Sequence, residues 1–249
     1  MNEHERRLKI WEMVQEHGSV YVNNLSELFS VSKVTIRGDL EHLEEQGLAK
    51  RFRGGITKNT LSSVNDIKKD NDREKVKKEI AKKAISYIND YDNIILGSGT
   101  TNESLAQEIA SSNLKGLTII TNNLMAINHL CKNKNISLIV LGGRYTHGNG
   151  STYGEEAEKS IEGMKVDVMF TGADGLDEIG VTSMHEGFSL SATLSKYTSK
   201  VIVLTESFKI GKRKQNKVLP LESIDVIITE SFNKEKVPSE LSEKIIFVD

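Results

Sequence analysis

The sequence predicts a small winged helix-turn-helix domain joined to a larger α/β domain with a mostly parallel sheet. Three short segments at the start of the chain keep apolar residues at helical spacing and lead into a glycine turn. Short apolar runs alternate with helical segments from residue 73 onward, as in parallel sheets covered on both faces. Between the two patterns lies a polar stretch without periodicity. We therefore divide the chain into a first domain (1–58), a linker (59–72) and a second domain (73–249).

The first domain begins with two helices and a tight turn. Apolar residues at helical spacing predict one helix over 4–16 and another around 25–29. Gly18 takes the place where helices commonly end, and Ser32 offers its hydroxyl as the N-cap of a third helix. The order helix, turn, helix follows from these signals.

The third helix has one apolar face and one polar face. Ile36, Leu40 and Leu43 follow the i, i+4, i+7 rule and should face inward. In a helix-turn-helix the second helix enters the major groove, where its first half reads base edges. The polar face could also be a solvated surface in an ordinary three-helix bundle. The candidate DNA-reading residues are Ser32, Lys33, Thr35 and Arg37.

A basic hairpin follows this helix. Residues 48–53 and 56–57 suit two short strands joined by the Gly54-Gly55 turn. Net charge does not favour nucleic acid, because 33 basic residues stand against 35 acidic ones. The basic residues nevertheless gather where the DNA-facing surface would lie. Those expected to hold DNA from the hairpin are Lys50, Arg51 and Arg53.

The second domain alternates strands and helices. A helix is expected to open it, through apolar residues spaced four apart between 76 and 88. The expected strands are 93–96, 117–121, 136–141, 166–171, 200–204, 225–229 and 245–248. The expected helices between them are 102–111, 123–131, 154–163 and 186–198.

The segment Leu96-Gly97-Ser98-Gly99-Thr100-Thr101 leaves a predicted strand and opens a helix. Backbone N–H groups and the helix dipole attract an anion at such a turn, and the Ser and Thr hydroxyls add donors. A phosphate would fit there. The alternative is plain turn geometry, since tight turns need glycine whether or not they bind anything. The segment is not a P-loop, because no Gly-Lys-Ser/Thr follows.

The helix-turn-helix residues resemble the DeoR family of bacterial regulators, whose pattern is V-S-x-x-T-I-R-x-D-L followed by L-x-x-x-G-x-L and a basic G-G turn. The resemblance continues into the second domain and covers nearly the whole chain. One departure is Gly38, where the family usually has a second basic residue. The matching residues are Val31-Ser32, Thr35-Ile36-Arg37, Asp39-Leu40, Leu43, Gly47-Leu48, Gly54-Gly55, Gly99-Thr100-Thr101, Thr121-Asn122, Gly142-Gly143 and Gly172-Ala173-Asp174-Gly175.

This resemblance implies a second domain similar to ribose-phosphate isomerases that responds to a phosphorylated sugar. Ser98 to Thr101 would hold phosphate, and Asn122, Asp174, Glu186 and Lys209 would line the remaining pocket. On position alone Asp174 could equally cap its own turn, and Lys209 could be a solvated surface lysine. The resemblance also implies a repressor that binds operator DNA as a homo-oligomer, a dimer or tetramer.

Two further departures concern the pocket. Where the family has E-A-E-x-K, this chain has Leu190 in place of the lysine, and where it has D-x-S-K, this chain has Glu206-Ser207-Phe208-Lys209. We expect a less cationic and more apolar pocket. Among the subgroups, the chain resembles the lactose phosphotransferase repressors in its L-G-x-G-T-T loop and its Lys209-Ile210-Gly211 run, which would make the effector a galactose- or tagatose-type sugar phosphate.

Other classes of protein fit less well. No run approaches the ~18 apolar residues of a membrane helix, and no export signal is present, so we expect a cytoplasmic protein. The single Cys131 excludes an internal disulfide and is expected to be buried, and the histidines 129, 147 and 185 lack metal-ligand spacing. We expect no metal and no cofactor. A phosphosugar isomerase with Asp174 and Lys209 in its active site is the alternative, but an isolated isomerase has no use for a complete winged helix.

Overall fold

The computed structural model describes residues 3–45, 49–52, 54–58, 64–146, 150–184, 189–232 and 237–248. The chain divides into two compact units, Met1–Asp70 and Asn71–Asp249. The helix α4 (Val64–Ile85) begins inside the stretch that the sequence suggested as a linker. None of the helices in the described ranges has the length and apolar character needed to cross a membrane.

In its described residues the first unit has three helices, the first residues of α4 and a three-stranded antiparallel sheet. Its core joins residues from every helix, among them Ile10, Leu25 and Ile36, all with no exposed surface. The sheet has the order β1-β3-β2, so the extended stretch after Gly18 adds a strand to the predicted hairpin. The elements are α1 (Glu3–His17), β1 (Ser19–Tyr21), α2 (Val22–Phe29), α3 (Lys33–Glu45), β2 (Ala49–Phe52) and β3 (Gly55–Lys58).

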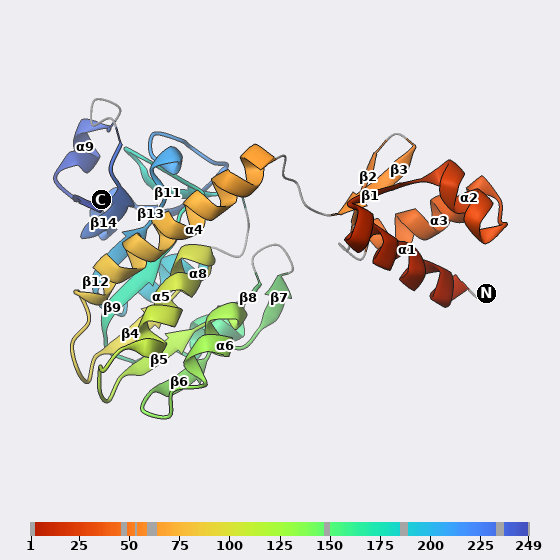
Figure 1. Cartoon of the computed structure of the whole chain (residues 1–249). Helices are drawn as coiled ribbons and strands as arrows, with labels where there is room; N and C mark the ends of the chain where they lie inside the picture. Colours follow the sequence, from red (N-terminus) through yellow and green to blue (C-terminus); the bar gives the residue numbers. More distant parts are fainter. Residues whose placement is uncertain are drawn as a thin grey trace. The chain divides into compact units, whose positions relative to one another are not determined.

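The second unit is built on a seven-stranded parallel sheet, which confirms the fold class expected from the sequence (Figure 1). The strand order is β15-β14-β12-β9-β4-β5-β6. Its strands are β4 (Asn93–Leu96), β5 (Thr118–Thr121), β6 (Ser137–Val140), β9 (Val166–Thr171), β12 (Thr198–Leu204), β14 (Val226–Glu230) and β15 (Ile245–Val248).

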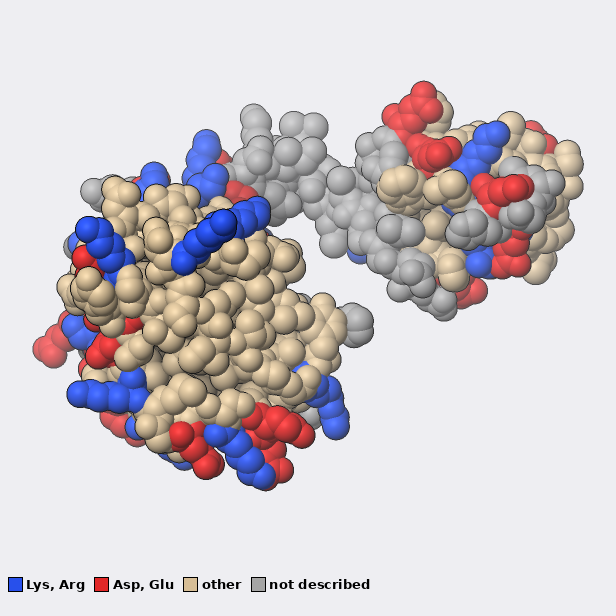
Figure 2. Space-filling view, turned by 90° about the horizontal axis from the view of Figure 1, so that it is seen from below, with Lys and Arg blue, Asp and Glu red and all other residues tan. Residues whose placement is uncertain are grey.

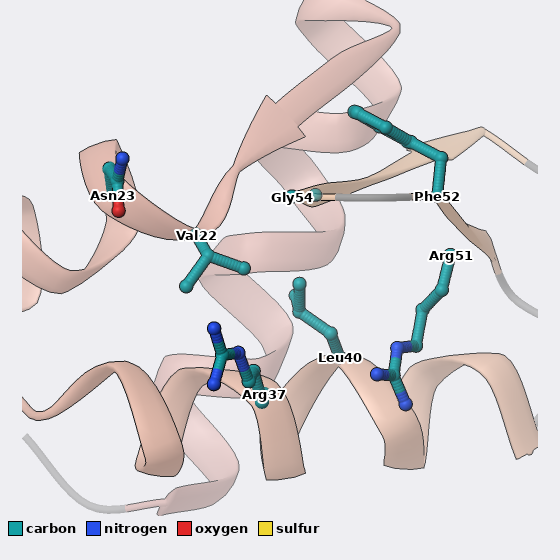
Figure 3. A pocket seen from close by; sticks show the side chains of 8 residues that line it. Val22, Asn23, Arg37, Leu40, Arg51, Phe52 and Gly54 are labelled. Atoms are coloured by element: carbon teal, nitrogen blue, oxygen red, sulfur yellow. The ribbon is translucent and has the colours of Figure 1, made fainter.

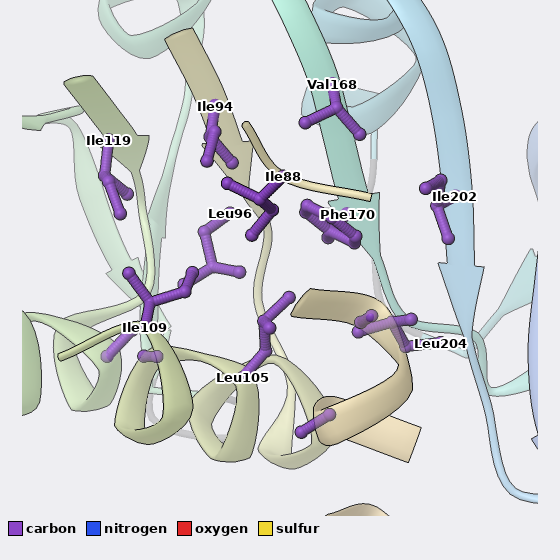
Figure 4. Close-up of a cluster of buried hydrophobic side chains, with 14 of the residues drawn as sticks. Ile88, Ile94, Leu96, Leu105, Ile109, Ile119, Val168, Phe170, Ile202 and Leu204 are labelled. Carbon is purple, nitrogen blue, oxygen red and sulfur yellow. The ribbon is translucent and has the colours of Figure 1, made fainter. Parts of the chain in front are cut away.

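Helices cover both faces of this sheet. Alternate residues of β4 point to opposite faces, so Ile94 and Leu96 pack in one core cluster and Ile95 in another. Figure 4 shows Leu105 and Ile109 of α5 pointing toward the strands. The helices α4, α5 (Thr100–Ser111) and α6 (Leu124–Leu130) contribute to the first cluster, and α7 (Glu155–Lys159) and α8 (Ser189–Ser195) to the second.

Several short elements were not expected from the sequence. A second, three-stranded sheet packs its own apolar cluster against β12 and β14. The helix α7 ends at Lys159, before its predicted end at 163, and α8 ends at Ser195 because β12 already begins at Thr198. The unexpected elements are β7 (Arg144–Thr146), β8 (Ser151–Tyr153), β10 (Gly175–Asp177), β11 (Gly180–Ser183), β13 (Asn216–Pro220), α9 (Ser239–Ser242) and the 3-10 turns η2 (Ser207–Lys209) and η3 (Leu221–Ser223).

Charge is mixed over the surface. The face of the second unit visible in Figure 2 carries a broad uncharged area, rimmed by basic and acidic side chains.

Cys131, expected to be buried, is exposed. It follows the last residue of α6, where Leu130 still faces the core and the chain then leaves the helix. Burial of the helix therefore stops one residue before the cysteine.

Candidate functional site

The turn between α2 and α3 is fixed by hydroxyl groups. Ser32 Oγ accepts a hydrogen bond from the backbone N–H of Thr35 at 3.0 Å and lies 2.9 Å from Thr35 Oγ1. This is the N-cap expected from the sequence. One turn earlier, Ser26 Oγ donates to the carbonyl oxygen of Val31 at 2.6 Å, and Ser30 takes a left-handed conformation with φ of 54°. Side-chain hydrogen bonds thus set the direction in which α3 leaves the turn.

The polar face of α3 is open to solvent. Lys33, Thr35 and Arg37 are exposed, while Ile36 and Leu40 are buried on the opposite face. Val34 lies on the open side with 75% of its surface exposed, which the sequence reasoning did not single out. The sequence could have indicated Val34, because it is apolar but does not share the buried face of α3. Such a residue in a recognition helix can contact the methyl group of thymine.

A shallow pocket lies between α3 and the hairpin, and Arg37 and Arg51 both line it. In Figure 3, Arg37 reaches from α3 toward Val22 and Asn23, and Arg51 reaches from β2 toward α3. Arg51 is also tied to α3, because its Nη1 lies 3.2 Å from Glu41 Oε1 and its backbone N–H donates to Glu44 Oε1 at 2.8 Å. Arg51 therefore holds the hairpin against the helix.

The side chain of Lys50 is exposed on β2 and makes no hydrogen bond or ion pair to the described part of α3. Arg53 lies outside the described residues. The structure thus brings Lys33, Arg37 and Lys50 to the surface of the first unit as candidate DNA contacts.

A buried ion pair fastens α1 to α3. Asp39 is 2% exposed and accepts hydrogen bonds from Arg6 Nε at 2.5 Å, from Arg6 Nη2 at 3.2 Å and from Arg7 Nε at 3.1 Å. The hydrogen bond to Asp39 raises the pKa of Arg6 above its ordinary value. Sequence reasoning gave Asp39 no role, although it falls three residues after Ile36 on the buried side of α3. A carboxylate in that position needs a cationic partner.

In the second unit, the loop between β4 and α5 has the shape expected of an anion site. Gly99 has φ of 108° and ψ of 155°, a conformation open essentially to glycine alone. It is the N-cap of α5, and no side chain caps the helix there. The first N–H groups of a helix have no partner within the helix. The loop therefore presents backbone donors and the positive end of the dipole of a twelve-residue helix.

A cleft opens at this loop, at the carboxyl ends of three neighbouring strands. Loops after β4, β9 and β12 supply its walls, which is where open parallel sheets bind ligands. The cleft brings together the predicted Ser98 to Thr101, Asp174 and Lys209. Its lining residues are Ser98, Gly99, Thr100, Thr101, Asn102, Gly172, Ala173, Asp174, Leu204 and Lys209.

Asp174 and Lys209 combine structural contacts with a place in the cleft. Asp174 Oδ2 accepts from Ser183 Oγ at 2.6 Å and from the N–H of Met184 at 3.3 Å. Lys209 is 23% exposed, and its Nζ lies 3.5 Å from the buried Glu206 Oε2. Lys209 is therefore not the solvated surface lysine of the alternative interpretation.

Two predicted pocket residues are not among those that line the cleft. Asn122 is buried and donates from Nδ2 to the carbonyl oxygen of Thr152 at 2.7 Å, which ties β5 to β8. Its neighbour Asn123 takes the place nearest the loop, with Nδ2 at 3.4 Å from the carbonyl oxygens of both Gly97 and Gly99. Glu186 lies outside the described residues. Sequence reasoning did not name Asn123. An asparagine at the start of a predicted helix, as an N-cap, was the feature that could have indicated it.

The departures near Lys209 act differently from what the sequence suggested. Leu190 is buried among the core residues under α8 and takes no part in the cleft. Phe208, expected to make the pocket more apolar, has three cations around its ring. Arg73 Cζ lies 4.8 Å from its ring centroid, Lys212 Nζ 5.3 Å and Lys209 Nζ 5.7 Å. The ring is half exposed, so its face is available to these side chains.

Among the residues that the structure describes, no group of three His, Cys, Asp or Glu side chains is placed to hold a metal ion. His129 contacts Glu103 Oε1 and Gln107 Nε2, both at 3.3 Å. The other two histidines considered as metal ligands, at positions 147 and 185, lie outside the described residues.

Comparisons with known proteins find a match for each of the two units. Residues 6–61 match the model of the DeoR-like helix-turn-helix domain, and residues 72–231 match that of the DeoR C terminal sensor domain. The chain is 34% identical over 232 residues to the putative aga operon transcriptional repressor of Escherichia coli O157:H7, covering 91% of this chain and 86% of that protein. It is 32% identical over 243 residues to the lactose phosphotransferase system repressor of Staphylococcus epidermidis strain RP62A, covering 95% of each.

Solved structures give a weaker likeness. A D-ribose-5-phosphate isomerase in complex with phospho-erythronic acid is similar over 55% of this chain and 53% of that one, with 18% identity and a TM-score of 0.42. Ribose 5 phosphate isomerase A from Neisseria gonorrhoeae is similar over 53% and 52%, with 15% identity and a TM-score of 0.41. Likenesses with TM-scores this low decide nothing further about the chain.

Proposed function

Because the chain belongs to the DeoR family of transcriptional regulators, we propose that it represses a sugar-metabolism operon and releases its operator when a phosphorylated sugar enters the cleft at Gly99. The chain is a regulator and not an enzyme. Two relatives are named as repressors, one of an aga operon and one of a lactose phosphotransferase system. From the resemblance to the lactose phosphotransferase repressors we infer a galactose- or tagatose-type sugar phosphate as the effector. The protein works in the cytoplasm as a homo-oligomer, since symmetric operators suit symmetric proteins.

The observation that carries this proposal is the cleft. It combines an uncapped helix N-terminus, two threonines and a half-buried lysine, all of which favour an anion. Asp174, in the same cleft, adds acceptor oxygens that suit sugar hydroxyl groups. A phosphate ester of a polyhydroxy compound meets both requirements.

DNA binding belongs to the first unit in this proposal. The major groove is contacted by Ser32, Lys33, Thr35 and Arg37. The DNA phosphate backbone is contacted from the hairpin by Lys50, Arg51 and Arg53. The open polar face of α3 supports the first set. Arg51 contributes mainly by fixing the hairpin to Glu41, as its contacts indicate.

The experiment is a double variant, Thr100→Val with Thr101→Val. Valine keeps the branched shape of threonine, so the turn should survive, but two hydroxyl donors leave the cleft. Each lost bond to a charged group costs ~1.5 to 3 kcal/mol, so effector binding should weaken by about two to four orders of magnitude. DNA binding should stay intact, because a ligand that no longer binds cannot shift that equilibrium.

The measurement is an operator titration with and without an effector found by thermal-shift screening of sugar phosphates. Ser112→Ala is the matched control, since it removes a hydroxyl from the other end of α5, where Ser112 Oγ donates to Ile109 O. The control should respond to the effector like the wild type. Release of the double valine variant at wild-type effector concentrations would contradict the proposed phosphate site.

A further inference from the structure

The first half of α3 turns an uncharged strip, formed by Val34 and Gly38, toward solvent. Val34 precedes the fully buried Ile36 by two residues, and Gly38 follows it by two. Two residues turn a helix through about 200°, so Val34 and Gly38 both lie on the side of α3 opposite the core. Val34 has 75% of its surface exposed, and Gly38 is exposed as well. Arg37 lies beside the strip and is also exposed.

Gly38 leaves the space next to Val34 open. Residues four apart are neighbours on the surface of a helix, so a side chain at position 38 would stand beside Val34. A Cβ placed at Gly38 meets nothing within 4 Å. Glycine also makes a helix interior less stable than alanine does, so the fold gains nothing from Gly38. Another surface can therefore approach the backbone of α3 closely at this point.

The place of Val34, more than its exposure, points to a role. Isolated apolar side chains are common on protein surfaces, so exposure alone assigns nothing. Val34, however, is the second residue of α3, which begins at Lys33. The N-terminal residues of a recognition helix are the ones that contact base edges in the major groove. Val34 is thus an apolar group at the centre of the surface that reads DNA.

The major groove offers such a residue one apolar partner, the C5-methyl group of thymine. We propose that Val34 contacts the methyl group of a thymine, which the bare backbone at Gly38 allows α3 to approach. Arg37 reads a neighbouring base by hydrogen bonds, so α3 combines an apolar with a polar contact. This inference rests on the proposed binding of operator DNA by α3 and adds to it a residue that selects thymine.

The test crosses a change in the protein with a change in the DNA. The full-length wild type first selects its binding sequence from a random double-stranded library. Each thymine of that sequence is then replaced in turn by deoxyuridine, which lacks only the 5-methyl group. Burial of one methyl group corresponds to about fourfold in affinity, so one of these replacements should weaken binding by the wild type about fourfold per protomer. In Val34→Ala the same replacement should change the affinity by less than about twofold.

Three variants separate this contact from effects on folding. Val34→Ala cannot weaken binding through unfolding, because the side chain is exposed and alanine favours a helix more than valine does. Val34→Thr keeps the branched shape but exchanges a methyl group for a hydroxyl, so it should lose part of the preference for thymine over deoxyuridine. Leu8→Ala is the matched control, since it truncates another apolar residue, on α1, that is 51% exposed. It should keep the full preference.

Each of the other outcomes overturns the inference. A fourfold preference for thymine that persists in Val34→Ala means that another residue contacts the methyl group. A selected sequence in which the wild type distinguishes no thymine from deoxyuridine means that Val34 contacts no methyl group. If the wild type selects no sequence at all, the proposed operator binding fails, and the assignment of Val34 fails with it.

Discussion

The substitution Asp39→Ala should unfold much of the first unit without touching any DNA-contacting side chain. Asp39 Oδ2 lies 2.5 Å from Arg6 Nε, and both side chains are nearly inaccessible. Removing one member of a buried ion pair leaves the other charge buried and uncompensated, which costs ~3 to 5 kcal/mol. A domain of this size has a total stability of about 3 to 10 kcal/mol. The loss is therefore comparable with the stability of the whole unit.

The single tryptophan provides the assay. Trp11 packs against the core of the first unit, and the sequence holds no other tryptophan. Urea unfolding followed by tryptophan fluorescence thus reports on this unit alone. Asp39→Ala should lower the urea midpoint strongly, and operator binding should fall in proportion to the unfolded fraction for every DNA sequence. The second unit, whose unfolding is followed by circular dichroism, should keep its wild-type urea midpoint.

Two variants sharpen the test. Glu41→Gln removes a charge from the same helix, but its partner Arg51 lies at the surface, so the cost should stay below about 1 kcal/mol. Asp39→Leu combined with Arg6→Met replaces the pair by apolar groups and should recover most of the stability. The reasoning would be refuted if Asp39→Ala shifted the midpoint no more than Glu41→Gln does.

Other substitutions test the remaining assignments. Gly38→Ala should stabilise the first unit by about 1 kcal/mol in the same fluorescence assay, because a Cβ there meets nothing within 4 Å and alanine favours the helix. Arg37→Ala should weaken operator binding by ~1 to 3 kcal/mol and relax specificity at one base in competition titrations, as loss of a bidentate base contact does. Lys50→Ala should instead weaken all sequences alike and lower the salt slope by about one, and sequence-dependent loss would remove Lys50 from the phosphate contacts.

The sequence revealed the regular parts of the fold because periodicity is a local property. The strands β4, β9 and β15 have the predicted limits, since each is a short, mostly apolar segment. The antiparallel sheet containing β10 and β11 was missed, because strands of three or four residues are too short to establish an alternation. Their burial comes from packing against β12 and β14, which no local pattern records.

The sequence predicted the part of the cleft that a local pattern shows. Ser98 to Thr101 stood out because a strand, small residues and a helix follow one another in the chain. Asp174 and Lys209 came from resemblance, and the structure brings both to the same cleft. Asn122 came from the same resemblance, and it binds the carbonyl oxygen of Thr152. Its neighbour Asn123 caps α6 and reaches the loop carbonyls, which depends on where α6 begins and is not visible in the sequence alone.

Stability and signalling are carried by different residues in this chain. The Arg6–Asp39 pair lies wholly within the first unit, and the cleft lies wholly within the second. Loss of the pair removes the DNA-binding unit itself, so no ligand can restore operator affinity. Loss of the threonine hydroxyls removes only the coupling, because an effector acts through its difference in affinity between two states. Linkage requires the converse as well: an effector that lowers operator affinity by some factor must bind the operator complex more weakly by the same factor. A repressor with an intact Asp39 and a silent cleft is therefore expected to stay bound, whereas one with an intact cleft and no Asp39 is expected to bind only through its folded fraction.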